Sequence, residues 1–240
     1  TNFSMEAIEQ TINGTSTLGG GATTGTVTIS RNGDLVGKVY VTSSSAAITN
    51  GAALVSEVTL EIGGQQIDKH TKEWMQIWAE LSTPDSKALA YKNMTGALSH
   101  GLNTTGTTGV GMVQVPLQFY FCRNPGLALP LIALQYHEVK LKFTWGTSAA
   151  AGAAAVCKVW CDYIYLDTEE RRRFAQVSHE YLIEQLQFQE EGSASSKIKL
   201  NFNHPVKEII WTGDSYTDAK ITLNGHDRFA ERSGDYFNYV

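Results

Sequence analysis

The sequence predicts an all-β protein made of antiparallel sheets, and three observations support this fold class. Several segments alternate apolar and polar residues with a period of two, the pattern of a strand with one buried and one wet face. Only 18% of the residues are charged, and 22 of the 240 are glycine, as suits short strands joined by many turns. Strands do not alternate with helices along the chain, which argues against a parallel α/β sheet.

The first clear strands lie between residues 27 and 62. A strand that opens at Val27 ends at Asn32-Gly33, a strong signal for a two-residue hairpin, and residues 35–41 return as its partner. A loop of small residues follows at 42–53. Residues 58–62 then alternate apolar and polar side chains and end at a glycine pair, which predicts another half-buried strand.

A helical insertion is predicted at 71–96. One apolar stripe follows the helical spacing i, i+3, i+4 and i+7: Trp74, Ile77, Trp78 and Leu81. Pro84 stops this helix and suits the first position of a second one, with Thr83 as its N-cap and Gly96 just past its end. We expect the stripe, with Trp74 and Trp78 as its largest members, to hold the first helix on the β body.

The stretch 114–145 contains two strand-like runs joined by a compact connection. The run 136–145 has one apolar face: His137, Val139, Leu141, Phe143 and Trp145. The run 117–121 is apolar throughout and predicts a more fully covered strand. Between them, Arg123, Asn124 and Pro125 with the following glycine have turn chemistry, and the apolar segment 127–134 is expected to close one end of the β structure. Small-residue loops at 99–111 and 146–155 flank this stretch, and we expect them, with 42–53, at the outer surface or between subunits.

A short helix is predicted after the strand at 157–165. Its acids come first and its bases, Arg171, Arg172 and Arg173, come last, as the helix dipole prefers. We therefore predict a first domain at 1–166 and a linker helix at 167–175. If the arginines bind a partner, ion pairs between barrels or subunits are favoured over nucleic acid, because acids beside them offset their charge.

Strands are predicted to resume in a second domain at 176–240. The segments expected to form them are 181–188, 198–202, 209–211 and 221–223. About 65 residues cannot hold eight strands at roughly 8–12 residues for each strand and turn. The chain therefore contains one β domain and part of another. Residues 221–229 also echo 60–68, a weak sign of internal duplication.

Composition and motifs argue against several function classes. The net charge of −5 includes no basic block, so no direct nucleic-acid binding is expected. Cys157 and Cys161 have no second cysteine pair or nearby histidine to complete a metal site, and we interpret them as buried apolar residues. The histidines are scattered, no G-x-S-x-G motif is present, and no cofactor or catalytic residue is predicted. No apolar run approaches the ~20 residues of a membrane helix.

Two further features each allow a functional interpretation and a simpler structural one. Asn2, Asn13, Asn93 and Asn103 begin N-x-[ST] sequons, which we expect to be unused because no signal peptide is visible. Trp74 and Trp78 could form a sugar platform, but their helical spacing with Ile77 and Leu81 favours core packing.

Several long blocks of the sequence carry a family resemblance. They are LEIGGQQIDKHTKEWMQIWAEL (60–81), PLQFYFCRNPGLALPLIALQYHEVKLKF (116–143), YIYLDTEERRRFAQVSHEYLIEQLQ (163–187), LNFNHPVKEIIW (200–211) and LNGHDRF (223–229). In this order they closely resemble the major capsid protein of nucleocytoplasmic large DNA viruses. The resemblance implies a double jelly roll, two eight-stranded sandwiches side by side, of which this chain holds the first and part of the second. It also implies an arm before Thr1 and the rest of the second jelly roll after Val240.

The resemblance further implies a non-enzymatic structural protein of the virion. Homotrimers would form pseudo-hexagonal capsomers that tile an icosahedral shell assembled in the host cytoplasm, with neighbouring capsomers and minor capsid proteins as partners. An alternative on the same fold is a carbohydrate-binding, lectin-like surface or spike protein, although the predicted loops lack the exposed aromatics of a lectin. A cupin-type metalloenzyme is a third class, which the missing histidine cluster disfavours.

Overall fold

The structure is a computed structural model that describes residues 2–43, 51–96, 113–151, 154–192, 197–212 and 216–239. The loops expected at 42–53 and 99–111 lie largely outside the described residues, as do residues 152–153 of the loop at 146–155. The chain forms two compact units, Thr1–Leu186 and Gln187–Val240.

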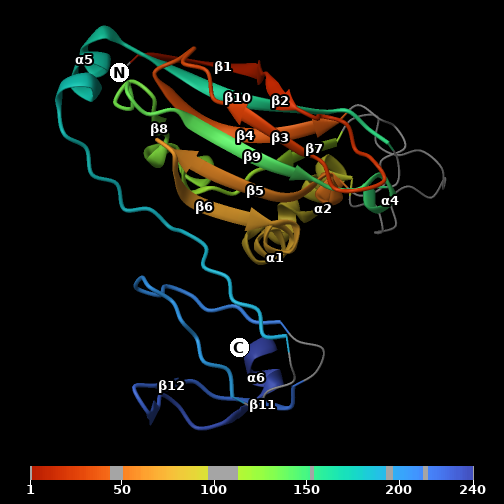
Figure 1. The fold of residues 1–240 in the computed structure, drawn as a ribbon. Coiled ribbons are helices and arrows are strands. Elements are labelled where there is room, and N and C mark those ends of the chain that lie inside the picture. The colour runs from red at the N-terminus through yellow and green to blue at the C-terminus, as the bar shows by residue number, and fades with distance from the viewer. Residues whose placement is uncertain are drawn as a thin grey trace. The chain divides into compact units, whose positions relative to one another are not determined.

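The first unit is a sandwich of two antiparallel sheets (Figure 1). The first sheet has the order β1 (Phe3–Gln10), β10 (Cys157–Leu166), β4 (Leu35–Ser43), β7 (Val113–Pro116), and the short β8 (Leu129–Pro130) also pairs with β4. The second sheet has the order β2 (Ile12–Gly14), β3 (Thr24–Thr28), β9 (Val139–Trp145), β5 (Val55–Ile62), β6 (Gln65–Thr71).

The strand order identifies a jelly roll. If the short β2 and β8 are set aside, the strands of the first sheet are the first, eighth, third and sixth along the chain, and those of the second sheet are the second, seventh, fourth and fifth. Two sheets built from eight strands that cross between them in this way form the double-sheet Greek-key sandwich.

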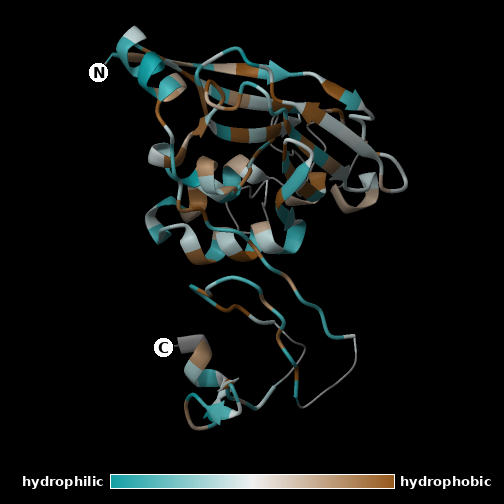
Figure 2. Cartoon of the chain, turned by 60° about the vertical axis from the view of Figure 1, so that its left-hand side comes forward, coloured by the Kyte–Doolittle hydropathy of each residue, from teal (hydrophilic) through white to brown (hydrophobic). Residues whose placement is uncertain are grey.

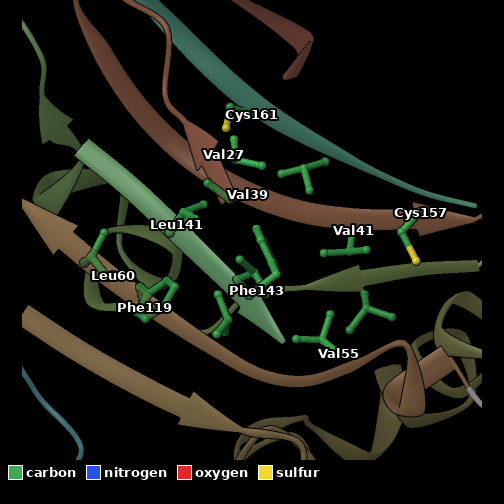
Figure 3. Packing of buried hydrophobic residues seen from close by; sticks show 14 of the residues in the cluster. Val27, Val39, Val41, Val55, Leu60, Phe119, Leu141, Phe143, Cys157 and Cys161 are labelled. Carbon is green, nitrogen blue, oxygen red and sulfur yellow. The ribbon is translucent and has the colours of Figure 1, made fainter. Parts of the chain in front are cut away.

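The core lies between the two sheets, where alternate residues point inward (Figure 3). On β9, Val139, Leu141, Phe143 and Trp145 are buried, as the alternation predicts. On β10, Cys157, Val159, Cys161 and Tyr163 are buried, which confirms the predicted face of that strand and the interpretation of both cysteines as core residues. Figure 2 shows the same alternation as bands of brown and teal along the strands.

The hairpin predicted at Asn32-Gly33 is wrong. The strand before it, β3, pairs with β9 in the second sheet, whereas the strand after it, β4, pairs with β10 in the first. The chain crosses between sheets here. Gly33 serves close packing, since a Cβ at this position would lie 2.9 Å from the Cβ of Tyr163.

The two runs of the central stretch differ from prediction at their ends. Residues 117–119 are not a strand and lead into the short helix α3 (Tyr120–Arg123), although Leu117, Phe119 and Phe121 are buried. His137 was predicted on the buried face of the following run but is exposed. It lies in a turn before β9, where its backbone N–H donates to the carbonyl of Leu134. The segment 127–134, predicted to close one end of the sandwich, follows η2 (Pro125–Leu127), contains β8, and buries Leu129 and Leu131.

The remaining helices lie in the connections. The helical insertion contains α1 (Lys72–Ser82), with Thr71 as its N-cap, and α2 (Asp85–Thr95), with the left-handed Gly96 at its end. Thr83, expected to cap α2, instead ends α1, and Pro84 takes the cap position. The other short helices are η1 (Gly51–Leu54), α4 (Ser148–Ala151) and α5 (Thr168–Gln176), the last at the site of the predicted linker helix.

The second unit holds two short strand pairs and one helix in its described part. They are β11 (Asp218–Ala219) with β14 (Arg232–Ser233), β12 (Thr222–Leu223) with β13 (His226–Asp227), and α6 (Gly234–Tyr239). The strand expected at 221–223 is therefore present as β12, and Asn224-Gly225 forms its turn with positive φ at both residues. The turn between β5 and β6, at Gly63-Gly64, likewise has positive φ at both residues.

The strands predicted at 181–188, 198–202 and 209–211 are not formed. Their described residues lack backbone ladders, and side chains bridge neighbouring segments instead. The amide of Gln189 donates to the carbonyl of Lys199 at 2.6 Å and accepts from the backbone of Asn201 at 3.0 Å. Period-two alternation marks these segments as extended, but a strand also needs a neighbour that supplies backbone partners.

Candidate interface around Trp78 and Arg123

Helix α1 carries a stacked pair of tryptophans. The rings of Trp74 and Trp78 lie one turn apart, with centroids 5.7 Å apart and planes inclined by 29°. Both side chains are half-buried, as is Ile77, while Met75 is buried and Leu81 is 60% exposed. The ring of Trp74 lies beside that of His70 on β6, with centroids 6.4 Å apart, whereas Leu81, predicted within the same stripe, faces away from the core.

Arg123 joins this tryptophan pair to a distant part of the chain. Its guanidinium carbon lies 4.8 Å from the centre of the Trp78 ring, and one of its terminal nitrogens lies 3.1 Å from a carboxylate oxygen of Glu184. A guanidinium over an indole face is attracted by the ring quadrupole. The sequence identified Trp78 and Arg123 separately, and the structure brings them together. Glu184 was missed, because a single acid in an alternating segment gives no signal of its partner.

Glu184 belongs to a segment, residues 181–186, that we call the strap. The side-chain amide of Gln185 donates to the carbonyl of Ile67 at 2.5 Å, and the backbone N–H of Leu186 donates to a carboxylate oxygen of Asp68 at 3.1 Å. Both contacts are on β6, the edge strand of the second sheet. The strap therefore covers part of an edge that would otherwise offer unpaired backbone groups.

A buried Asp–His pair lies under the strap. The Nε2 atom of His70 is 3.0 Å from Oδ2 of Asp68, and both side chains are almost completely shielded from solvent. The His70 ring stacks on Phe119 with centroids 4.6 Å apart. The other carboxylate oxygen of Asp68, Oδ1, accepts from the backbone N–H of Lys69 at 2.8 Å and from that of Leu186, so it joins β6 to the strap.

Asn124 and Pro125 shape the chain directly after Arg123. The side-chain oxygen of Asn124 accepts from the N–H of Gly126 at 2.9 Å, and Pro125 takes the first position of η2. Their role in the structure is a local turn that ends α3 at the residue contacting Trp78.

The arginines of α5 form a separate set of contacts. Arg171 makes two contacts with the buried Asp34, at 2.9 Å from Nε and 3.1 Å from a terminal nitrogen, and Asp34 also accepts from the N–H of Leu166 at 2.8 Å. Arg172 lies 3.9 Å from Glu169, with both side chains exposed. Arg173 lines a shallow cavity of about 360 Å³ together with Glu170, Phe174, His179, Glu180 and Tyr181.

The contacts described above hold segments of the chain together. Within the described part of the chain, no group of three or more His, Cys, Asp or Glu side chains is arranged to hold a metal ion. Burial raises the pKa of Cys122 and of Cys157 to about 12 and raises that of Cys161 as well, which keeps these thiols protonated. Among the described residues, no helix is both long and apolar enough to span a membrane.

Comparison with known proteins places this architecture among viral capsid proteins. Residues 1–167 match the family model "Major capsid protein N-terminus", and residues 170–216 match the model "Large eukaryotic DNA virus major capsid protein". All of this chain aligns with the major capsid protein of Pyramimonas orientalis virus at 53% identity, covering 66% of that protein. It aligns with that of Paramecium bursaria Chlorella virus 1 at 40% identity, covering 69%. Among these curated relatives and two further ones, from Phaeocystis pouchetii virus and Chrysochromulina ericina virus, the chain spans between about half and two thirds of each protein's length.

A solved structure shows the same fold. The structure titled "PBCV-1 virus capsid, quasi-atomic model" superposes with a TM-score of 0.81 at 36% identity, over 100% of this chain and 73% of that one. Together with the strand order of the first unit, this similarity confirms the predicted all-β double jelly-roll class.

Proposed function

Because this chain belongs to the major capsid protein family of large eukaryotic DNA viruses, we propose that its copies assemble as homotrimers that form pseudo-hexagonal capsomers. These capsomers would tile an icosahedral shell. The observation that carries the proposal is the jelly-roll strand order of the first unit, joined to family matches along residues 1–216. Two sheets packed face to face give a stiff body that can be repeated as a building block.

The proposed organisation of the chain follows the same reasoning. A first jelly roll would span 1–166, α5 would link it within 167–175, and residues 176–240 would begin the second jelly roll. The family models support this division, since one ends at residue 167 and the next begins at residue 170. The pairing of Arg171 with Asp34 fixes the start of the linker on the first unit.

The candidate interface has a structural role in this proposal. Trp74, Trp78, Arg123, Asn124 and Pro125 would hold the helical insertion and the turn after α3 in the shape that a capsomer needs. Arg172 and Arg173 are exposed and would make ion pairs between barrels or subunits. We also propose that the protein is not an enzyme, that it assembles in the host cytoplasm, and that it contacts minor capsid proteins rather than nucleic acid.

The test is the native mass of the full-length protein beside its mass under denaturing conditions. A native mass three times the denatured mass supports the homotrimer, and electron microscopy of the same sample should show particles with pseudo-sixfold outlines. A protein that stays monomeric at all concentrations contradicts the proposal, and sugar binding would then be tested on a glycan array.

A further inference from the structure

The two outer faces of the first unit differ in chemistry. On the second sheet, outward residues of β9, β5 and β6 form ion pairs on the surface. Lys69 lies 2.7 Å from Glu57, Lys142 pairs with Glu61, and Lys140 lies 2.8 Å from the adjacent Glu138. Threonines of β3 lie beside this row, opposite Lys140, Lys142 and Thr144 in the strand register. A sheet face of this kind is suited to water.

The outer face of the first sheet has an apolar end. The register of β1 and β10 places Phe3 opposite Leu166 and Met5 opposite Ile164. These residues alternate with the inward Tyr163 and so point away from the core. Phe3 is 62% exposed and Met5 is 57% exposed, although both lie within a regular strand. We call Phe3, Met5, Ile164 and Leu166 the apolar outer face. Figure 1 shows β1 at the edge of its sheet, next to β10.

The rest of this face carries charges of both signs. Lys158 lies 3.0 Å from Glu9, and burial raises the pKa of Asp162 while the charge of Lys38 lowers it. The indole N–H of Trp160 donates to the hydroxyl of Thr42 at 3.1 Å. A face that combines exposed apolar side chains with charges of both signs offers little to a strongly charged partner such as nucleic acid and favours contact with another protein surface.

The helix next to this face has a charge pattern that complements a copy of itself. α5 begins two residues after Leu166, with Glu169 and Glu170 in its first turn and Arg172 and Arg173 further along. Glu169 and Arg172 are 84% and 61% exposed, and their separation of 3.9 Å is long for an ion pair, so both remain open to another partner. In a ring of identical copies, the acidic end of this helix in one copy can face the basic end of the helix in the next copy.

We propose that the apolar outer face, with the adjoining α5, is the surface through which one copy of this chain binds a second copy. The inference rests on the proposed self-assembly and adds the face that makes the contact. Phe3 and Met5 would be covered by the neighbouring copy, whereas the ion-paired outer face of the second sheet would remain in water. Because β1 is the edge of its sheet, the same contact would also shield its free backbone groups.

The first test compares two double variants of the full-length protein by analytical ultracentrifugation. Phe3→Glu with Met5→Glu places two charges on the apolar outer face, and Thr24→Glu with Thr26→Glu places two charges on the outward side of β3 as a matched control. We expect the first variant to weaken self-association at least tenfold and the control to assemble as the parent does. Thermal melting at low concentration checks that both variants fold.

The second test detects the contact directly. Cys157 and Cys161 are buried, and the pKa of the partly exposed Cys122 is raised to about 12, so Met5→Cys adds a more exposed and more reactive thiol than any of the three. Met5→Cys should react with a thiol reagent in the dilute, monomeric protein and be protected in the assembled protein, because the neighbouring copy covers it. Thr26→Cys is the control and should react at the same rate in both states, and equal reactivity of Met5→Cys in both states would overturn the inference.

The outcomes separate this inference from the proposed function. If the parent assembles but the Phe3→Glu, Met5→Glu variant assembles equally well, the face is wrong and self-assembly stands. If that variant instead melts at a lower temperature as a monomer while assembling normally, another part of the same chain covers the face, which also overturns the inference. A parent that never assembles overturns both.

Discussion

Cys122, Cys157 and Cys161 show how burial controls the chemistry of a side chain in this sandwich. Burial raises the pKa of Cys122 and Cys157 to about 12, so only about one thiol in ten thousand is ionised at pH 8. Since the thiolate is the reactive form, we expect Ellman's reagent to react very slowly with the folded protein. After denaturation, it should react with all three thiols. Rapid reaction of a single thiol at pH 8 would show that its site opens to solvent.

The same thiols make stability depend on pH. In the unfolded chain a thiol loses its proton near pH 8.5, whereas in the folded protein the pKa of Cys157 is about 12. The folded state therefore binds more protons between these values, and stability is lost as the pH rises through that window. Urea denaturation should give a lower free energy of unfolding at pH 10 than at pH 8. In a Cys157→Ala variant this difference should shrink by up to about 2 kcal/mol.

Trp78 is the residue whose removal best tests the candidate interface. A fully buried tryptophan costs about 3–5 kcal/mol when truncated to alanine, but Trp78 is half-buried and gains part of its contact from Arg123. We therefore expect Trp78→Ala to lower the free energy of unfolding by about 1–3 kcal/mol in urea denaturation. The control is Leu81→Ala on the same helix, which should change stability little because Leu81 is exposed. Equal stabilities of Trp78→Ala and the parent would contradict a packing role.

At the scale of elements, the anchoring of α5 depends on one ion pair. Arg171 contacts both carboxylate oxygens of the buried Asp34, which also accepts from the backbone N–H of Leu166. Removing the Arg171 guanidinium therefore leaves a buried carboxylate with fewer partners. Because Arg171 is about half exposed, we expect Arg171→Gln to weaken this attachment by about 1 kcal/mol. Limited trypsin digestion after Arg173 should then proceed about fivefold faster. Arg172→Gln removes the same number of cleavage sites and charges, and it should leave the rate unchanged.

The sequence predicted the positions of strands better than it predicted which strands pair. Alternation located β9 and β10 and the buried face of each, because burial repeats every two residues on a strand. Alternation does not name the partner strand, so the turn signal at Asn32-Gly33 was interpreted as a hairpin although the chain there crosses between sheets. The same limit explains the predicted strand at 181–188, part of which is a strap held by Asp68 and Gln185.

The candidate interface was only partly predictable for a related reason. Trp78 and Arg123 stand out through helix spacing and turn chemistry, which are local properties of the sequence. Their contact with each other and with Glu184 joins segments that are tens of residues apart. The buried pair of Asp68 and His70 gave no signal either, since its members are two residues apart on β6, a spacing shared by many exposed pairs.

At the scale of the whole molecule, folding should not require a metal ion. The core is held by apolar side chains from both sheets, and the described residues contain no cluster of metal ligands. We expect the melting temperature to be the same with and without an excess of EDTA. A large drop on chelation, reversed by added zinc, would show that Cys157 and Cys161 bind metal despite their burial.

The two units should also differ in their resistance to local opening. The first unit buries a continuous core between two sheets, and β5 and β10 each pair with a strand on both sides. The described ladders of the second unit are only two residues long, and apolar side chains such as Leu200 and Leu223 are about half exposed. Amide protection follows the free energy of opening, which is highest in well-packed central strands. In hydrogen exchange on this 240-residue chain, we therefore expect the amides of β5, β9 and β10 to exchange slowest. Residues 197–212 should exchange nearly as fast as an unfolded peptide, and equal protection of the two units would mean that the second has a core of comparable stability.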